Sequence, residues 1–440
     1  MMDTRDYFLT LSDHLCKGVR GSEVLLLAYS GEQSDFVRLN QGRIRQAGRV
    51  EQSELTLDLI EGARHSASHH ELSGHLDRDL AMLGAVISGL REQRAHLPED
   101  PHLFFASDVR SSDHQILDGD WSSEQAVRDV LAACDGKDLV GVFAGGDMYR
   151  GFANSLGQRN WFRNRTFNFD WSVYLHGDKA VKADYAGMRW SADTLHERFD
   201  GVETELEAMG RAPMDLKPGR YRTYLAPSAL NEIVQMLAWG GFGLKSHRTA
   251  QTPLLRMVRD GVSMSPRVSL SEDISTGMGP GFTATGFIKP KRVELIRDGR
   301  YGDCLVGPRS AREFGAEVTG SESPRSLVMN GGGLAPTDVL EALGTGLLVN
   351  NLWYCNYTDR NACRITGMTR FACFWVEHGR IQAPVNVMRF DDSVYSMLGE
   401  RLVDLTSQPE LLLSSSSYGE RSTLSSQLPG ALVDGLRFTL

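Results

Sequence analysis

The sequence predicts an α+β protein in which a mixed α/β N-terminal domain is followed by a β-rich C-terminal domain. Three observations support this class. The chain has 440 residues, more than the roughly 250–300 at which a single hydrophobic core stops growing, so two domains are expected. Strand-like and helical patterns of apolar residues follow one another in the first half. The second half is richer in glycine and in short strand-like runs.

The first half opens with a short helical segment, which is followed by strands of one sheet. Residues 23–30 form an apolar run typical of a buried strand, and residues 53–59 alternate between leucines and polar residues. From Leu76 the apolar spacing becomes helical and stops before Pro98, which predicts a long amphipathic helix packed on the sheet. Residues 122–124 (SSE) supply the start signal of a second helix.

A domain boundary is predicted at residues 212–219 (APMDLKPG). Two prolines and a glycine in this short segment are typical of a linker between folded units. The predicted domains are therefore residues 1–211, a mixed α/β unit, and residues 220–440, a β-rich α+β unit.

The second half begins with a predicted strand and a predicted helix. The strand covers residues 221–225, and a helix begins near Pro227, with a buried stripe of Leu230, Ile233, Val234 and Leu237. Further strands are predicted at 292–297 and 374–377, each followed by turn residues. The serine tract 414–417 predicts a solvated loop.

Composition excludes several classes of function. The chain has a formal net charge of -9. Nucleic-acid binding requires a clustered excess of Lys and Arg to neutralise phosphates, so no nucleic-acid partner is expected. No apolar run approaches the roughly 20 residues of a membrane helix, and the acidic start of the chain is unlike a signal peptide. We expect a cytoplasmic protein. Its six cysteines are dispersed and expected to be reduced: Cys16, Cys134, Cys304, Cys355, Cys363 and Cys373.

Three segments carry a resemblance to a known family. Residues 343–385 contain LGTGLLV and then ITGMTRFACFWVEHGRIQAPV, residues 294–315 read ELIRDGRYGDCLVGPRSAREFG, and residues 151–158 read GFANSLGQ. Together, and in their order along the chain, these segments resemble the TldD/PmbA family of bacterial peptidase proteins, and within it the PmbA (TldE) branch. Taken singly, the glycines and Pro384 would also suit ordinary turns and a strand end. The resemblance implies a TldD/PmbA-like fold over the whole chain.

The resemblance also implies where a zinc site would lie. In the catalytic TldD branch a helix near the start of the second domain carries HExxxH, and a later cysteine completes a zinc site at which bound water becomes nucleophilic. The corresponding helix here reads NEIVQMLAWGG, in which Gln235 and Gly240 stand at the histidine positions and Met236 at the glutamate position. The late cysteine has no counterpart, since no cysteine follows Cys373. We therefore expect no metal in this chain and zinc in a TldD-like partner.

A literal HExxxH occurs elsewhere, at His70, Glu71 and His75. Residues i and i+5 of an ideal helix point about 140° apart, so this spacing chelates one ion only on a distorted helix. The pattern instead predicts a polar turn between a strand ending near His70 and a helix for which Ser73 is a suitable N-cap. Metal binding by this histidine-rich turn is the alternative. A further set has separations that match no compact zinc spacing, namely Cys363, Cys373, His247 and His378.

Three hypotheses of function follow. The first is a PmbA/TldE-like subunit that pairs with a TldD-like catalytic subunit in a heterodimer and helps process unfolded peptides, without binding the catalytic zinc itself. The second is a self-contained homodimer that binds or processes a peptide or small metabolite without metal. The third is a metallopeptidase that uses His70 and His75. No catalytic residues are assigned, and Trp353, Tyr354 and Arg370 are candidates for peptide contact, with core packing as the alternative for the aromatic residues.

Overall fold

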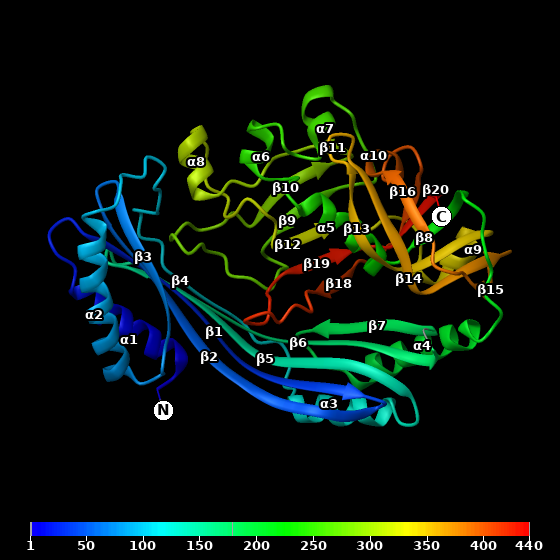
Figure 1. The fold of residues 1–440 in the computed structure, drawn as a ribbon, viewed down its shortest axis with the longest axis horizontal. Coiled ribbons are helices and arrows are strands. Elements are labelled where there is room, and N and C mark those ends of the chain that lie inside the picture. Colours follow the sequence, from blue (N-terminus) through cyan, green and yellow to red (C-terminus); the bar gives the residue numbers. More distant parts are fainter. Residues whose placement is uncertain (1, 178, 440) are drawn as a thin grey trace.

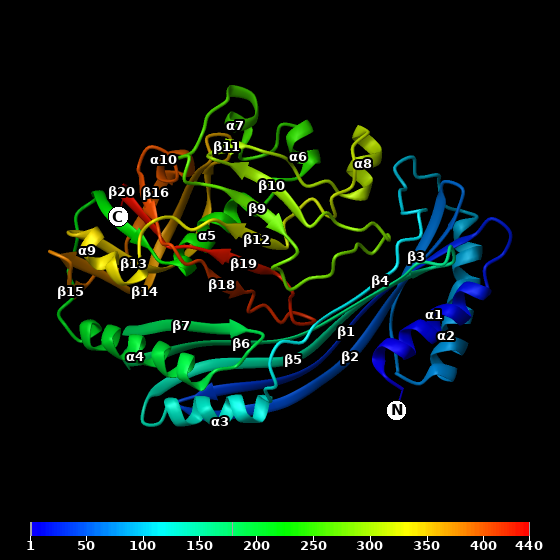
Figure 2. The same ribbon diagram turned by 180° about the vertical axis from the view of Figure 1, so that it is seen from behind.

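The computed structural model describes residues 2–177 and 179–439. A long, curved sheet forms the base of the molecule, and the C-terminal half lies over one end of it (Figures 1 and 2). The long sheet has seven strands in the order β3-β2-β1-β5-β6-β4, with β7 paired to β6. Its strands are β1 (Val24–Asn40), β2 (Arg43–Glu61), β3 (Arg64–Glu71), β4 (Ser112–Ile116), β5 (Asp138–Asn154), β6 (Arg159–His176) and β7 (Lys179–Gly187).

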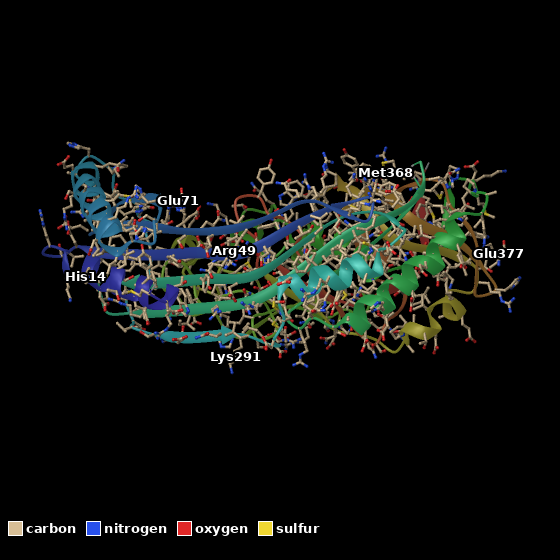
Figure 3. All side chains as sticks on the ribbon, turned by 90° about the horizontal axis from the view of Figure 1, so that it is seen from below. His14, Arg49, Glu71, Lys291, Met368 and Glu377 are labelled. Atoms are coloured by element: carbon tan, nitrogen blue, oxygen red, sulfur yellow. The ribbon has the colours of Figure 1, made fainter. Side chains whose placement is uncertain are left out.

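Four helices cover this sheet in two pairs. Helices α1 (Thr4–Lys17) and α2 (Leu76–Arg94) pack at one end, where Phe8 and Leu83 share a core with leucines of β1 and β2. Helices α3 (Ser123–Ala133) and α4 (Ala192–Met209) lie at the other end, on the side away from most of the C-terminal half (Figure 3). The predicted start of the second helix is confirmed, because Ser122 caps α3 by accepting a hydrogen bond from the backbone N–H of Gln125 at 3.2 Å.

The C-terminal half contains two more sheets. The first is a seven-stranded sheet. Its strand β13 pairs with both β8 and β14, so the order β13-β8-β20-β16-β14 closes on itself as a small barrel. The other has six strands in the order β11-β10-β9-β12-β19-β18. The barrel sheet comprises β8 (Gly219–Leu225), β13 (Gly346–Asp359), β14 (Arg364–Glu377), β15 (Arg380–Pro384), β16 (Arg389–Ser393), β17 (Leu402–Leu405) and β20 (Ala431–Phe438). The six-stranded sheet comprises β9 (Leu270–Asp273), β10 (Arg292–Arg297), β11 (Arg300–Tyr301), β12 (Ser326–Met329), β18 (Glu410–Leu413) and β19 (Ser425–Leu428).

Helix α5 (Pro227–Ala238) is buried between these two sheets. Its predicted apolar stripe is confirmed, since Leu230 and Ile233 share a core with Leu295 of β10 and Val433 of β20. The remaining helices are short: α6 (Leu244–Arg248), α7 (Leu255–Asp260), α8 (Pro308–Phe314), η1 (Pro336–Asp338), α9 (Val339–Leu343) and α10 (Val394–Met397). Among the described residues, no helix combines the length and the hydropathy that crossing a membrane requires.

The predicted fold class is confirmed, with a mixed α/β first half and a β-rich second half. The predicted strands 23–30 and 53–59 are parts of much longer strands, which pair from Val24 opposite Ile60 to Asn40 opposite Arg43. The boundary at residues 212–219 stays a prediction. The two halves share a hydrophobic core in which Trp171 of β6 and Phe199 of α4 lie with Phe374 of β14.

Candidate functional site

A cleft of about 670 Å³ opens between the long sheet and the C-terminal half. One wall is formed by β6, β7 and the outer face of α5, and the other by the β13–β14 hairpin. The end of β18, the start of β19 and the loop residues next to them close the cleft from a third side. Because residues far apart in the sequence meet here, the cleft exists only in the folded chain.

Strand alternation places polar side chains on the first wall. Phe169 and Trp171 of β6 turn into the shared core, so Asp170 between them faces the cleft. Asp184 of β7 lies directly opposite Asp170 in the ladder and therefore on the same face. Lys182 of β7 pairs with Asp170, with its Nζ 2.9 Å from a carboxylate oxygen. The result is an ion pair beside a second carboxyl group.

Burial perturbs two carboxyl groups of this wall. Desolvation raises the pKa of Asp184, against the opposing effect of Arg198, and Ser228 of α5 donates a hydrogen bond to its Oδ1 at 3.3 Å. Desolvation also raises the pKa of Glu232 on α5, while the nearby Lys182 ammonium opposes the shift. Carboxyl groups in a cleft with raised pKa values mark a candidate binding or proton-transfer site.

The second wall is aromatic and carries one cation. The guanidinium carbon of Arg370 lies 3.6 Å from the ring centroid of Trp353 and 4.6 Å from that of Phe371. The β13–β14 ladder shifts register near Trp353, and Tyr354 and Phe371 adopt positive φ angles of 51° and 57°. Bulky residues rarely adopt this conformation, and such strain is typical of functional sites.

The structure brings together the three residues predicted to contact peptide, since Trp353, Tyr354 and Arg370 all line the cleft. Core packing does not describe the two aromatic residues, because Trp353 is 37% exposed and Tyr354 72% exposed. Contact with a peptide stays a prediction. Tyr357, a third aromatic residue of the same strand, instead packs against the hydrophobic core of the C-terminal half.

The three degenerate zinc-motif positions are not brought together. Gln235 faces the cleft, where its Nε2 donates to Oδ1 of Asn231 at 3.3 Å and to Oγ of Ser426 at 3.2 Å. Met236 is buried in the core on the other side of α5. Gly240 lies beyond the last residue of the helix, at a φ of 75°. Only an amide therefore reaches the cleft from these positions.

The cleft contains groups that the sequence analysis missed, namely Asp170, Lys182, Asp184 and Glu232. One signal was available in β6, where Asn168, Asp170 and Ser172 alternate with large aromatic residues and so mark a polar face. Glu232 gave no such signal, because one acidic residue on an amphipathic helix is ordinary.

The literal HExxxH lies far from this cleft. His70 and Glu71 end strand β3, and His75 immediately precedes α2, so the predicted strand-to-helix turn is confirmed. The prediction that Ser73 is the N-cap is wrong: His75 occupies that position, while Ser73 donates to the buried Asp79 at 2.8 Å. Glu71 and Met368 of β14 lie in opposite halves of the molecule (Figure 3).

Replacing His70 and His75 with alanine should change the free energy of unfolding by no more than about 0.5 kcal/mol, as is usual at a polar surface turn. His70 makes a hydrogen bond of 3.0 Å to Ser68, and His75 is exposed, so little packing is lost. Thermal unfolding and any activity of the complex should both stay near the wild-type values. Lost activity at an unchanged melting temperature would instead favour a metallopeptidase centred on these histidines.

A half-buried carboxyl group on α4 predicts a pH dependence of stability. Burial raises the pKa of Glu205 on α4 to about 7, although the Asn350 amide donates to it at 2.7 Å and opposes the shift. The folded state thus binds this proton more tightly than the unfolded state. Its contribution to stability is present below the ordinary pKa of 4.5 and is lost as pH rises through about 7.

Glu205→Gln should therefore lose less stability than the wild type as pH rises, because the amide keeps the hydrogen-bonding oxygen and cannot ionise. Melting temperatures measured from about pH 5 to about pH 8 check this difference. Glu203→Gln is the matched control, since Glu203 lies on the same helix and is 54% exposed in its pair with Lys137. Equal pH profiles for the wild type and Glu205→Gln would contradict the expectation.

Comparisons with known proteins define the class. A family model described as the PmbA/TldA metallopeptidase C-terminal domain matches residues 218–440. The chain therefore belongs to the TldD/PmbA family. It is 34% identical over 245 residues to the metalloprotease PmbA of Escherichia coli O157:H7, a match that covers 53% of this chain and 52% of that protein. The match thus spans about half the length of this curated relative.

Solved structures show the same fold. TldE from Thermococcus kodakarensis superposes with a TM-score of 0.78 and 12% identity, over 99% of this chain and 100% of that one. A Thermotoga maritima protein superposes with a TM-score of 0.76 and 12% identity, over 99% of both chains. At this level of identity the likeness establishes the fold alone.

The family's description implies a metal, and the donors present do not fit one. Across the described ranges 2–177 and 179–439, no three His, Cys, Asp or Glu side chains are grouped so that they could hold a metal ion. Burial raises the pKa of Cys363 to about 12 and that of Cys373 to about 11, which disfavours the thiolate that zinc requires.

Proposed function

We propose that this chain is a PmbA/TldE-like subunit of a TldD/TldE-type metallopeptidase complex, acting in the processing of unfolded peptides without binding the catalytic zinc itself. One observation carries the proposal: helix α5 presents the amide of Gln235 to an open cleft, with Met236 in the core and Gly240 beyond the helix. The cleft keeps the dimensions of a ligand site while α5 supplies no imidazole to it.

The role proposed for this subunit follows from its fold, which is kept although α5 contains no histidine. A homologue that keeps the fold without metal ligands can supply half of an interface or part of a substrate channel in a heteromeric enzyme. The zinc, its ligands and the general base then belong to a TldD-like partner. An obligate interface of this kind typically buries upwards of about 2,000 Å².

The test compares this chain alone, a TldD-like protein of the same genome alone, and the two co-expressed. We expect the isolated chain to hold no stoichiometric zinc by elemental analysis and to cleave no unstructured peptide. The co-expressed proteins should co-elute in size-exclusion chromatography, and their activity should exceed the sum of the separate activities.

Two outcomes would contradict the proposal. One tightly held zinc per chain, lost together with a chelator-sensitive peptidase activity, would show that this chain is itself catalytic. Separate elution together with full activity of the partner alone would favour a self-contained homodimer that binds peptides or metabolites without metal.

A further inference from the structure

Arg370 is a cation of the cleft for which the described part of the chain supplies no anionic partner. Other arginines of this region are neutralised, since Arg364 pairs with Asp391 and Arg401 with Asp392 at 2.7 Å. By contrast, no carboxylate in the described residues lies within 4.0 Å of the Arg370 guanidinium, and its nitrogens make no hydrogen bond to the described protein atoms. An arginine positioned in a cleft with all its donors free is prepared to bind an anion.

The aromatic residues around Arg370 hold it without using its donors. The rings of Trp353 and Phe371 lie within stacking distance of the guanidinium carbon. A cation–π contact depends on the charge of the guanidinium and does not consume its five N–H donors. The two rings therefore restrict the position of the guanidinium and leave its N–H groups available for a ligand, which lowers the entropy lost on binding.

The shape and charge of the cleft narrow the class of anion. Its volume of about 670 Å³ suits several residues of an extended peptide rather than a single inorganic ion. The wall formed by Asp170, Asp184 and Glu232 is acidic, and Lys182 neutralises only part of it. A polyanion would be repelled by that wall, whereas a ligand with one carboxylate can reach Arg370 and keep the rest of its chain near the acidic groups.

We propose that Arg370 anchors the carboxylate of a peptide in this cleft, so that the subunit itself selects peptides with a free C-terminal carboxylate. The inference deepens the proposed function and rests on it for the peptide class of the ligand. An acidic side chain offers the same chemical group, and the experiment separates these two sources. A carboxylate accepts two parallel N–H bonds from one guanidinium, a geometry that a neutral C-terminal amide cannot match.

Fluorescence anisotropy with the full isolated chain tests the proposal. Three short, labelled, unstructured peptides are compared: one with a free C-terminal carboxylate and no acidic side chain, its C-terminal amide, and the amide with one internal glutamate. The free-carboxylate peptide should bind about tenfold more tightly than the amide. Arg370→Gln should abolish this preference, and Arg370→Lys should keep part of it as a point charge.

Arg360→Gln is the matched control. Arg360 lies at the turn of the same hairpin and also contacts two rings, with its guanidinium carbon 4.9 Å from the Tyr357 centroid and 5.5 Å from that of Trp239. Its donors, however, are bound to the carbonyl oxygens of Gln251 and Trp239, and it does not line the cleft. The peptide preference should survive this substitution.

Glu232→Gln should change the affinity in the direction opposite to Arg370→Gln. It removes a negative charge across the cleft and should therefore strengthen binding of the carboxylate peptide.

Melting temperatures show whether Arg370→Gln is folded, and if it is not, the binding preference of Arg370→Lys decides between the outcomes. Tight binding of the internal-glutamate peptide would support carboxylate anchoring and assign it to side chains. Equal affinity of the wild type for all three peptides would overturn the proposal. No partner is present in this assay, so its outcome is independent of whether the complex forms.

Discussion

Arg421→Ala is expected to lower the free energy of unfolding by about 3–5 kcal/mol, as when one partner of a buried charged network is removed. Arg421 belongs to the loop between β18 and β19 and is only 5% exposed. Its Nη2 donates to both the carbonyl oxygen and Oγ1 of Thr166 at 2.9 Å, and its Nη1 donates to the carbonyl oxygen of Gly146 at 3.3 Å. Burial lowers its pKa to about 10, so it remains a cation at neutral pH.

The expected loss of stability arises from the polar groups that would no longer have Arg421 as a partner. Glu32, 2% exposed, accepts a hydrogen bond from the backbone N–H of Arg421 and would remain as a buried carboxylate without the nearby cation. The backbone carbonyl oxygens of β5 and β6 would lose a charged donor. Because Arg421 ties this loop to the long sheet, the third side of the cleft should loosen and peptide affinity should fall.

Urea unfolding and peptide anisotropy on the same samples measure both effects. Arg49→Ala is the control, because its pair with Glu51 spans 3.6 Å and both side chains are more than 60% exposed. That variant should differ from the wild type by about 0.5 kcal/mol at most. A loss below about 1 kcal/mol for Arg421→Ala would show that the loop is not anchored by this residue.

Phe374→Ala should cost a similar amount, about 3–5 kcal/mol, and should also weaken the attachment between the two halves. Phe374 of β14 is fully buried in the core that contains Trp171 and Phe199 from the first half. Truncation leaves a cavity at this junction, and the surrounding strands can close it only partly. Residues 212–219 connect the halves, so their exposure to protease should increase.

Phe8→Ala is the control that separates the loss of stability from the weaker attachment between the two halves. Phe8 is also fully buried, but its core under α1 and α2 contains residues of the first half alone. Both variants should lose comparable stability in urea, whereas only Phe374→Ala should speed cleavage within residues 212–219. Identical cleavage rates would mean that the shared core does not hold the halves together.

Several elements of the fold could be predicted from local sequence patterns. The starts of α3 and α5, strand β10 and the turn after β3 were all predictable, because each depends on capping, proline position or periodicity within about ten residues. The absence of imidazoles from α5 was visible for the same reason. Trp353, Tyr354 and Arg370 were predicted to contact peptide and all line the cleft, whereas the peptide contact itself stays a prediction.

Which side chains lie next to one another depends on the tertiary structure alone. Asp170, Asp184 and Glu232 lie on three different elements, and Arg421 reaches β5 and β6 from more than 250 positions away in the sequence. Such contacts depend on strand register and on how the barrel docks on the long sheet, and neither leaves a local pattern. Local sequence patterns predicted the type of most elements, and the sequence shows that α5 contains no histidine. The cleft, its charge pattern and the anchoring of its loop arose from long-range packing, because burial and pairing are properties of the folded chain.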